Sequence, residues 1–135
     1  KADLVTADGG FDFSNDYVNQ EINMTQLIFC EIVTGLSILK IGGHMVIKIF
    51  DIFRNSTVEI MYMLSLYFNK IYITKPFTSR PANNEKYIVC KSFKLNDTYQ
   101  LIKKFSLFFN KLSSHYSINS ILNIKIPFAI INVFF

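Results

Sequence analysis

The chain has 135 residues, of which half are hydrophobic, and it carries a formal net charge of +4. This length fits one domain or part of one, and the apolar content is ample for a hydrophobic core. No signal peptide is recognisable. The apolar run 126–135 is interrupted by Pro127 and is shorter than the ~20 helical residues that span a bilayer. We therefore expect an intracellular, soluble protein without membrane association, whose mild positive charge is compatible with an anionic partner.

The first fifty residues predict strand, helix and strand. Residues 3–10 predict a short buried strand that ends in an acid and a double-glycine turn. Residues 19–40 have apolar side chains at helical spacing, and Lys40 with Gly42 is a stop signal for that helix. Residues 44–50 predict a second buried strand.

The next segment predicts a second helix and two further strands. Residues 56–68 predict the helix, with Ser56 and Glu59 at capping-box spacing. Residues 70–76 and 86–93 predict the strands, and a polar loop of about nine residues without a helix separates them. Such a short connection favours an antiparallel return of the last strand.

The end of the chain predicts one more helix and an apolar tail. Asn96 or Asp97 can cap this helix. One of its faces is apolar, formed by Ile102, Phe105, Phe109 and Leu112. The chain starts at Lys1 without a methionine and ends abruptly in an apolar run. We therefore expect both ends to be cuts through a larger protein.

The order strand, helix, strand, helix, strand, strand is typical of half of an α/β sheet. The first three strands are expected to be parallel, because helices connect them. Residues 3–9, apolar on both faces, predict a central strand whose neighbour in the sheet would come from elsewhere.

The cysteine and histidine pattern gives no indication of a metal site. Cys30 and Cys90 lack CxxC spacing and stand in apolar runs, so we expect buried, reduced thiols. His44 and His115 have no nearby ligand partners in the sequence, which leaves a structural zinc site unsupported.

Three charged side chains are predicted to meet at one edge of the sheet. Ligands of open α/β sheets bind beyond the carboxyl ends of the strands. Asp8 ends the first strand, Lys48 lies near the end of the second, and Glu85 starts the antiparallel strand, all on that edge. Each also has a purely structural interpretation: a turn aspartate, a lysine extended from an edge strand and a loop acid. Their convergence favours a functional site.

Three segments in order, "DLVTADGGF", "GGHMVIKIFD" and "TSRPANNEKYIVC", resemble the FtsJ-like ribose 2′-O-methyltransferases. The match is best with the eukaryotic and viral branch that methylates the first transcribed nucleotide of capped mRNA. The resemblance covers about residues 3–93 and continues loosely into the tail. It implies a Rossmann-like S-adenosylmethionine-dependent methyltransferase fold. Residues 1–94 would be the C-terminal half of the catalytic domain, and residues 95–135 a truncated helix and apolar tail.

The resemblance also implies a catalytic tetrad of Lys, Asp, Lys and Glu. Asp8, Lys48 and Glu85 match its last three members, and Asp8 would also contact S-adenosylmethionine. The first lysine and the glycine-rich cofactor loop lie upstream in the family and have no counterpart here. The chain alone is therefore expected to be incomplete and inactive.

The family's RNA contacts fall on the polar loop and on the start of the first helix. The loop asparagine of the family matches Asn83, and weaker correspondences fall on Asn19 and Gln20. Arg80 can pair with phosphate, while Lys75 and Lys86 would add positive charge for the RNA backbone. Alternatively, Asn83 and Arg80 only hold the loop through bonds to the backbone.

The implied chemistry suits these residue types. Methyl transfer to a ribose 2′-hydroxyl requires alignment of the reactants and a base that accepts the hydroxyl proton. Lysine is such a base only in its neutral form, which burial favours and neighbouring carboxylates oppose. We expect Lys48 to be the base, with Asp8 and Glu85 as the acids that orient it.

Two alternatives remain open at the level of sequence. One is a ribosomal or transfer RNA 2′-O-methyltransferase, which would share the same tetrad; the other is a non-catalytic RNA-binding domain of the same fold. The protein would act in the nucleus if cellular and in the cytoplasm if it comes from a cytoplasmic virus. The oligomeric state is not indicated.

Overall fold

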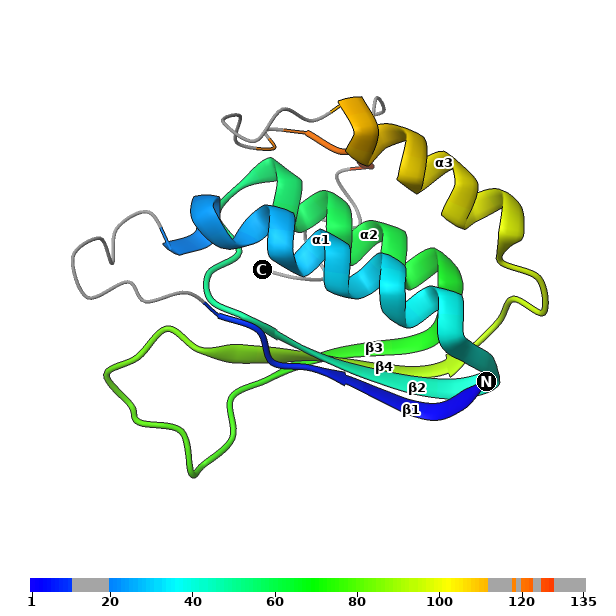
Figure 1. Cartoon of the computed structure of the whole chain (residues 1–135). Coiled ribbons are helices and arrows are strands. Elements are labelled where there is room, and N and C mark those ends of the chain that lie inside the picture. Colours follow the sequence, from blue (N-terminus) through cyan, green and yellow to red (C-terminus); the bar gives the residue numbers. More distant parts are fainter. Residues whose placement is uncertain (11–19, 112–117, 119, 123–124, 128–135) are drawn as a thin grey trace.

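The computed structural model describes residues 1–10, 20–111, 118, 120–122 and 125–127 (Figure 1). It contains a mixed sheet covered on one face by two helices, with a third helix lying over them. The elements, in chain order, are β1 (Ala2–Ala7), α1 (Gln20–Ile38), β2 (Leu39–Ile49), α2 (Asn55–Tyr67), β3 (Phe68–Thr74), β4 (Lys86–Phe93) and α3 (Tyr99–Lys111). The predicted α/β fold class and the predicted order of elements are confirmed.

The four strands are arranged in the order β1-β2-β4-β3. β1 and β2 are parallel, and β4 runs antiparallel to both of its neighbours, β2 and β3. β3 therefore runs in the same direction as β1 and β2, as the helical connections predict. β1 is the edge strand of this sheet, and the last strand in the sequence lies between the second and the third.

The core lies between the sheet and the helices α1 and α2. Alternate residues of β2 are completely buried on that face, namely Met45, Ile47 and Ile49. Because side chains alternate along a strand, Lys48 projects from the opposite face. This placement of one lysine among buried neighbours follows from the period of two in the segment "MVIKI".

The helix α3 packs on α1 through aromatic rings. Phe29 of α1 is fully buried, and its ring centroid lies 5.0–5.5 Å from those of Phe105, Phe108 and Phe109. Such edge-to-face and tilted contacts are the favoured geometries of aromatic pairs. The predicted apolar face of the third helix is thus confirmed at Phe105 and Phe109, and Leu112 lies outside the described residues.

The predicted end of the first helix is wrong by a few residues. The helix ends at Ile38, and both Lys40 and Gly42 lie inside β2. Pairing with β1 decides the boundary, because Ala2 pairs with Leu39 and the carboxylate of Asp3 forms an ion pair with Lys40. Sheet pairing therefore extends the strand backwards through the predicted stop signal.

The predicted capping box of α2 is also wrong. Ser56 is buried, and its hydroxyl has no hydrogen-bond partner in the described part of the chain. Instead, Oε1 of Glu21 in α1 accepts hydrogen bonds from the backbone N–H of Arg54 (2.8 Å) and from the hydroxyl of Thr57 (2.7 Å). The start of α2 is therefore stabilised by a side chain from another helix.

Glu59, the second residue of the predicted box, binds the tail. Its carboxylate is buried and accepts hydrogen bonds from the Ser120 hydroxyl and from the backbone N–H groups of Ile121 and Leu122. At the third helix the predicted cap is displaced by one residue: Thr98 directly precedes α3 and accepts the N–H of Ile102, while Oδ1 of Asp97 accepts a hydrogen bond from the N–H of Tyr99 at 2.8 Å.

The two cysteines differ in environment. Cys90 is buried, as predicted, and burial raises the pKa of its thiol to about 12. Cys30 is exposed, which corrects the prediction that both are buried: it lies on the outer side of α1. No metal-binding group of three His, Cys, Asp or Glu occurs among the described residues, which leave out His115. None of the described helices has both the length and the apolar character needed to cross a membrane.

Candidate active site

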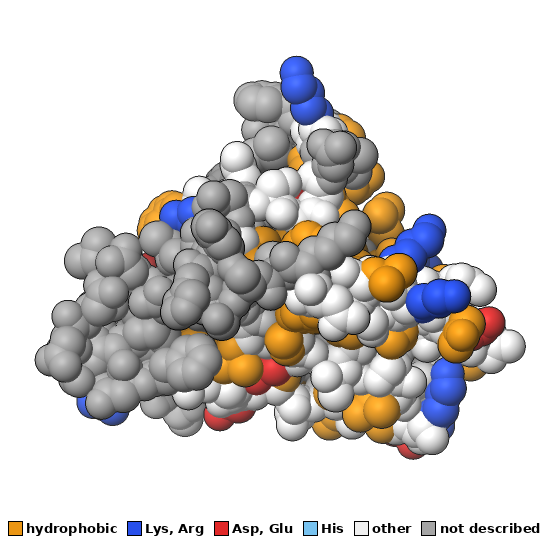
Figure 2. All heavy atoms as spheres, turned by 45° about the horizontal axis from the view of Figure 1, so that its top comes forward, with side chains coloured by type: hydrophobic (Ala, Val, Ile, Leu, Met, Phe, Trp, Pro, Cys, Tyr) orange, Lys and Arg blue, Asp and Glu red, His pale blue; other side chains and the backbone are white. Residues whose placement is uncertain are grey.

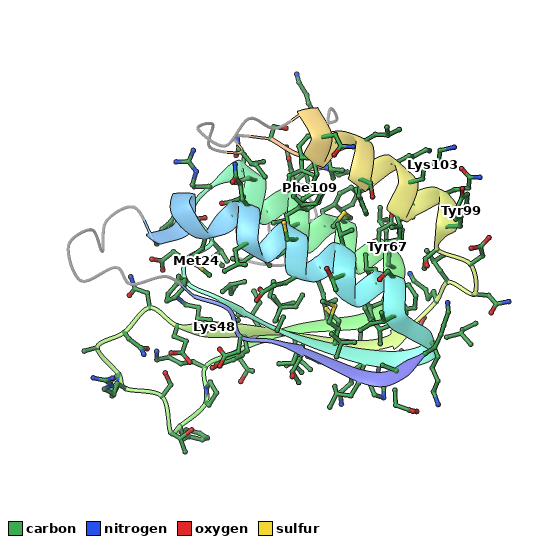
Figure 3. All side chains as sticks on the ribbon, in the orientation of Figure 1. Met24, Lys48, Tyr67, Tyr99, Lys103 and Phe109 are labelled. Carbon is green, nitrogen blue, oxygen red and sulfur yellow. The ribbon has the colours of Figure 1, made fainter. Side chains whose placement is uncertain are left out.

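The carboxyl ends of β1 and β2 and the start of β4 lie at the same end of the sheet, and each of them carries a predicted site residue. Asp8 follows β1, Lys48 is the penultimate residue of β2, and Glu85 precedes β4. Strand pairing places them together: Ala7 is opposite Ile47, and Ile49 is opposite Lys86. Lys48 lies at the sheet edge from which the loop 75–85 extends (Figure 3). The predicted convergence is confirmed for the backbone positions.

Lys48 and Asp8 form an ion pair. The Lys48 ammonium lies 2.9 Å from Oδ1 of Asp8 and donates to the backbone oxygen of Asp8 at 3.1 Å. The Lys48 side chain is only 15% exposed, whereas that of Asp8 is 69% exposed. The Phe50 ring lies 5.9 Å from the ammonium, within range of a cation–π contact. Lys48 is thus held at a fixed place, while the Asp8 carboxylate stays accessible.

The double-glycine turn after β1 is attached to α1. The N–H of Gly9 donates to Oε1 of Glu31 at 2.8 Å, and a side chain at Gly9 would collide with that carboxylate. A Cβ at Gly10 would lie 3.5 Å from the Lys48 ammonium, so glycine keeps the space beside the lysine open. Glu31 escaped the sequence analysis, because an acid within an apolar run carries no signal of this contact.

Glu85 is held by two neighbours of its own strand and loop. Its Oε1 accepts a hydrogen bond from the hydroxyl of Tyr87, and its Oε2 accepts one from Nδ2 of Asn83 at 3.2 Å. No hydrogen bond or ion pair joins Glu85 to Lys48 in the described residues. The carboxylate therefore takes its orientation from Tyr87 and Asn83.

Tyr87 links the two halves of the site and was missed by the sequence analysis. It is directly opposite Lys48 across β2 and β4, on the same face of the sheet. The hydrogen bond to Glu85 is the main cause that raises the pKa of Tyr87 to about 12, followed by burial and by the charges of Glu85 and Asp8. Tyr87 therefore stays a neutral donor at ordinary pH. Only the strand register reveals its place.

The loop 75–85 is organised by a lysine. The ammonium of Lys75 donates to the backbone oxygen of Asn83 (2.7 Å), to its Oδ1 (2.8 Å) and to the backbone oxygen of Glu85 (3.1 Å). Ser79 donates to the same Oδ1 at 3.1 Å. The Asn83 side chain thus takes part in the loop structure through bonds to other side chains and not, as the alternative interpretation has it, to the backbone; any contact with RNA would be additional.

Lys86 is also engaged within the protein. Its ammonium lies 3.2 Å from Oδ1 of Asp51 and donates to the backbone oxygen of Phe50 at 3.1 Å. The two lysines expected to add charge for RNA therefore have internal partners. Arg80, by contrast, is exposed, and its guanidinium makes no hydrogen bond or ion pair within the described parts of the chain.

A pocket of about 250 Å³ opens between the loop and the end of the sheet. Its lining is mostly polar and is formed by Pro76, Thr78, Ser79, Arg80, Asn83, Glu85 and Tyr87. The pocket joins the predicted RNA-contacting residues Arg80 and Asn83 to the predicted catalytic residue Glu85. Of the other two predicted RNA contacts, Asn19 lies outside the described residues, and Gln20 is the first residue of α1.

The positive charge of the chain is not confined to this edge. In Figure 2, Lys and Arg side chains gather along the right-hand side of the molecule. Figure 3 shows Lys103 and Tyr99 on that side, at the opposite end from Lys48. Net charge is therefore a poor guide to the site, and only individual side chains of the loop can mark a place for RNA.

Comparison with known proteins gives the family. Residues 1–93 match the model of the FtsJ-like methyltransferases, which is more than half of the chain. The chain belongs to this family.

The chain is similar to several proteins that carry the name cap-specific mRNA (nucleoside-2′-O-)-methyltransferase 1. The Mus musculus protein is 36% identical over 95% of this chain, and the Danio rerio protein is 46% identical over 67% of it. The Dictyostelium discoideum protein is 43% identical over 67% of the chain. The matched regions cover 15%, 11% and 12% of these relatives, so the chain spans only a small part of their length.

A solved structure shows the same fold. The crystal structure described as a ribosomal RNA methyltransferase from Plasmodium falciparum superimposes with a TM-score of 0.55 and 23% sequence identity. The match covers 69% of this chain and 47% of that chain. At this level of identity it supports the Rossmann-like fold class alone.

Proposed function

We propose that this chain provides catalytic residues of an S-adenosylmethionine-dependent enzyme that methylates an RNA ribose 2′-hydroxyl. Residues 1–94 would form the C-terminal half of the methyltransferase domain, and residues 95–135 the segment that follows it. The observation that carries the proposal is the Lys48–Asp8 ion pair at the carboxyl ends of β1 and β2, beside a polar pocket that contains Glu85.

Lys48 is the group we assign to proton transfer. Its nitrogen lies in a site that is mostly closed to solvent, and a neutral amine at this place can accept a proton. Asp8 fixes this nitrogen in place through two contacts, at 2.9 and 3.1 Å. In its neutral form, Lys48 would accept the proton of a ribose hydroxyl placed within hydrogen-bonding reach of this nitrogen.

The described residues fit part of a cofactor site. The Asp8 carboxylate is 69% exposed although it is ion-paired, and Gly10 leaves the space next to Lys48 free of side chains. Asp8 would hold the cofactor at this edge. S-adenosylmethionine would supply an electrophilic methyl group there.

The proposed substrate is capped mRNA, methylated at its first transcribed nucleotide. Support comes from the names of the relatives, which are 36–46% identical to this chain. The free guanidinium of Arg80 at the pocket suits a phosphate group, because Arg presents several donors in a planar fork. A cellular enzyme of this kind would act in the nucleus, and a viral one in the cytoplasm.

The test uses the full-length protein with capped and uncapped RNA of the same sequence. Lys48→Ala is expected to lower kcat by about 10²- to 10⁴-fold, the usual contribution of a positioned acid or base. Lys48→Arg is expected to fail as well, because a guanidinium stays protonated at working pH. Lys70→Ala, which removes an exposed lysine of β3, is the matched control and should retain activity.

Two results would contradict the proposal. A robustly active Lys48→Arg protein would exclude Lys48 as the base. Equal methylation of capped and uncapped RNA would exclude cap dependence, while leaving the 2′-O-methyltransferase chemistry in place.

A further inference from the structure

Two phenylalanines are unusually exposed. Phe77 is 110% exposed and Phe53 is 80% exposed relative to an extended reference, and the next large hydrophobic side chain among the described residues is Tyr99, at 64%. Phe29, in contrast, is fully buried against three other rings. Exposed aromatic rings of this degree leave both ring faces open to solvent and contribute almost no burial energy to the fold.

Both phenylalanines belong to the loops that border the candidate active site. Phe53 lies between the end of β2 and the start of α2, and Phe77 lies in the loop 75–85 after β3. β2 and β3 run in the same direction, so both loops leave the sheet at the edge that contains Lys48. Figure 1 shows the loop 75–85 projecting beyond this edge of the sheet.

The two loops are bonded to each other. Nδ2 of Asn84 donates to Oδ2 of Asp51 at 2.8 Å, and the ammonium of Lys86 lies 3.2 Å from Oδ1 of the same aspartate. Phe53 is therefore on a segment that is fastened to the base of the Phe77 loop. The residues on either side of Phe77, Pro76 and Thr78, line the pocket that contains Glu85.

We propose that Phe53 and Phe77 are stacking platforms for nucleobases next to the ribose that is methylated. Single-stranded RNA is bound in this way, by bases that are splayed out and stacked on aromatic side chains while cationic groups contact the backbone. Here the cation is provided by the exposed Arg80, which lines the same pocket as Glu85. The identification of RNA as the ligand rests on the proposed function, whereas the choice of these two residues rests on their exposure and position.

The experiment measures the binding of short single-stranded RNA to the full-length protein with Phe53→Ala, Phe77→Ala and the double variant. Each single substitution is expected to weaken binding about 5- to 150-fold, which corresponds to the ~1–3 kcal/mol of one base–aromatic stack. The affinity for S-adenosylmethionine should stay unchanged. Tyr99→Ala, which removes the exposed ring at the far end of the molecule, is the matched control.

A scan with abasic nucleotides gives a readout that a merely structural role would not produce. An abasic site at the stacked position should weaken binding by the wild-type protein, and the same RNA should bind Phe77→Ala no worse than intact RNA does. Unchanged RNA affinity in both phenylalanine variants would overturn the proposal, as would an equal loss in Tyr99→Ala. If base-dependent binding holds but no methyl transfer occurs, the stacking stands and the proposed function fails. If methylation occurs but is indifferent to both phenylalanines, the stacking fails alone.

Discussion

Replacing Asn83 by Asp tests the support of Glu85 most directly. The side chain keeps its shape and its Oδ1, so the bonds from Lys75 and Ser79 can persist. Its Nδ2, which donates to Oε2 of Glu85 at 3.2 Å, becomes a carboxylate oxygen. A hydrogen bond is thereby exchanged for a contact between two negative charges.

The size of the effect follows from this distance. Two unit charges 3.2 Å apart repel by about 1 kcal/mol in a water-like dielectric and by about 5 kcal/mol at the effective dielectric of partly buried sites. Since 1.4 kcal/mol is tenfold, kcat/KM for RNA should fall between about fivefold and several thousandfold. In Asn83→Ala, which only loses the hydrogen bonds, kcat/KM for RNA should fall by about ten- to 150-fold, because a hydrogen bond to a charged group contributes ~1.5–3 kcal/mol.

The assay is steady-state methyl transfer with the full-length protein, together with titration of S-adenosylmethionine. Cofactor affinity should be nearly unchanged in both variants, while RNA use is impaired. The deficit of Asn83→Asp should shrink with added salt and with falling pH, because screening or protonation reduces the repulsion. Asn96→Asp controls for the added charge at a distant exposed position.

Either of two outcomes would refute this reasoning. An Asn83→Asp enzyme that is as active as the wild type would mean that Glu85 does not depend on the Asn83 amide. Equal losses of RNA use and of cofactor affinity in Asn83→Ala would mean that the loop has only a structural role.

Two further predictions concern Tyr87 and the isolated chain. In a spectrophotometric titration, the difference between the wild type and Tyr87→Phe isolates the phenol of Tyr87, which should ionise near pH 12. The stability that this phenol contributes should be present below pH ~10 and should be lost as the pH rises to about 12. Ionisation of the phenol near pH 10 would contradict its hydrogen bond to Glu85. The 135-residue polypeptide expressed alone should bind S-adenosylmethionine poorly and tend to aggregate, because β1 pairs only with β2 among the described residues, which leaves its other edge open, and Leu4 is 55% exposed. Calorimetric binding at micromolar affinity with one-to-one stoichiometry would contradict the second prediction.

Local sequence patterns were sufficient for the elements and for the backbone of the site. Hydrophobic periods of two and 3.6 indicate most of the strands and helices, because one face of such an element is buried. β1 is an exception: it is predicted to be buried on both faces, but none of its residues is buried in this chain. Parallel connection through helices then brings Asp8 and Lys48 to one edge, and the short polar loop brings Glu85 there by an antiparallel return. These steps need only spacing and connectivity, which the chain carries locally.

Element boundaries and cap partners depended on contacts that local patterns do not record. The stop signal at Lys40 and Gly42 is overridden by pairing with β1, and the capping box of Ser56 is replaced by Glu21 of another helix. The exposure of Cys30 depends on which side of α1 faces the sheet and α3. In each case the competing interaction comes from a segment that is distant in sequence.

The side-chain network of the site was decided by the tertiary structure alone. The role of Tyr87 follows from its register opposite Lys48, and that of Lys75 from a loop that folds back on its ammonium group. Likewise, Glu31 reaches the double-glycine turn only because α1 packs over the end of β1. Hydrogen bonds require partners within about 3 Å, and packing between elements sets that proximity. The residue types alone therefore determined which chemical groups the chain can offer, whereas the fold determined which of these groups contact one another.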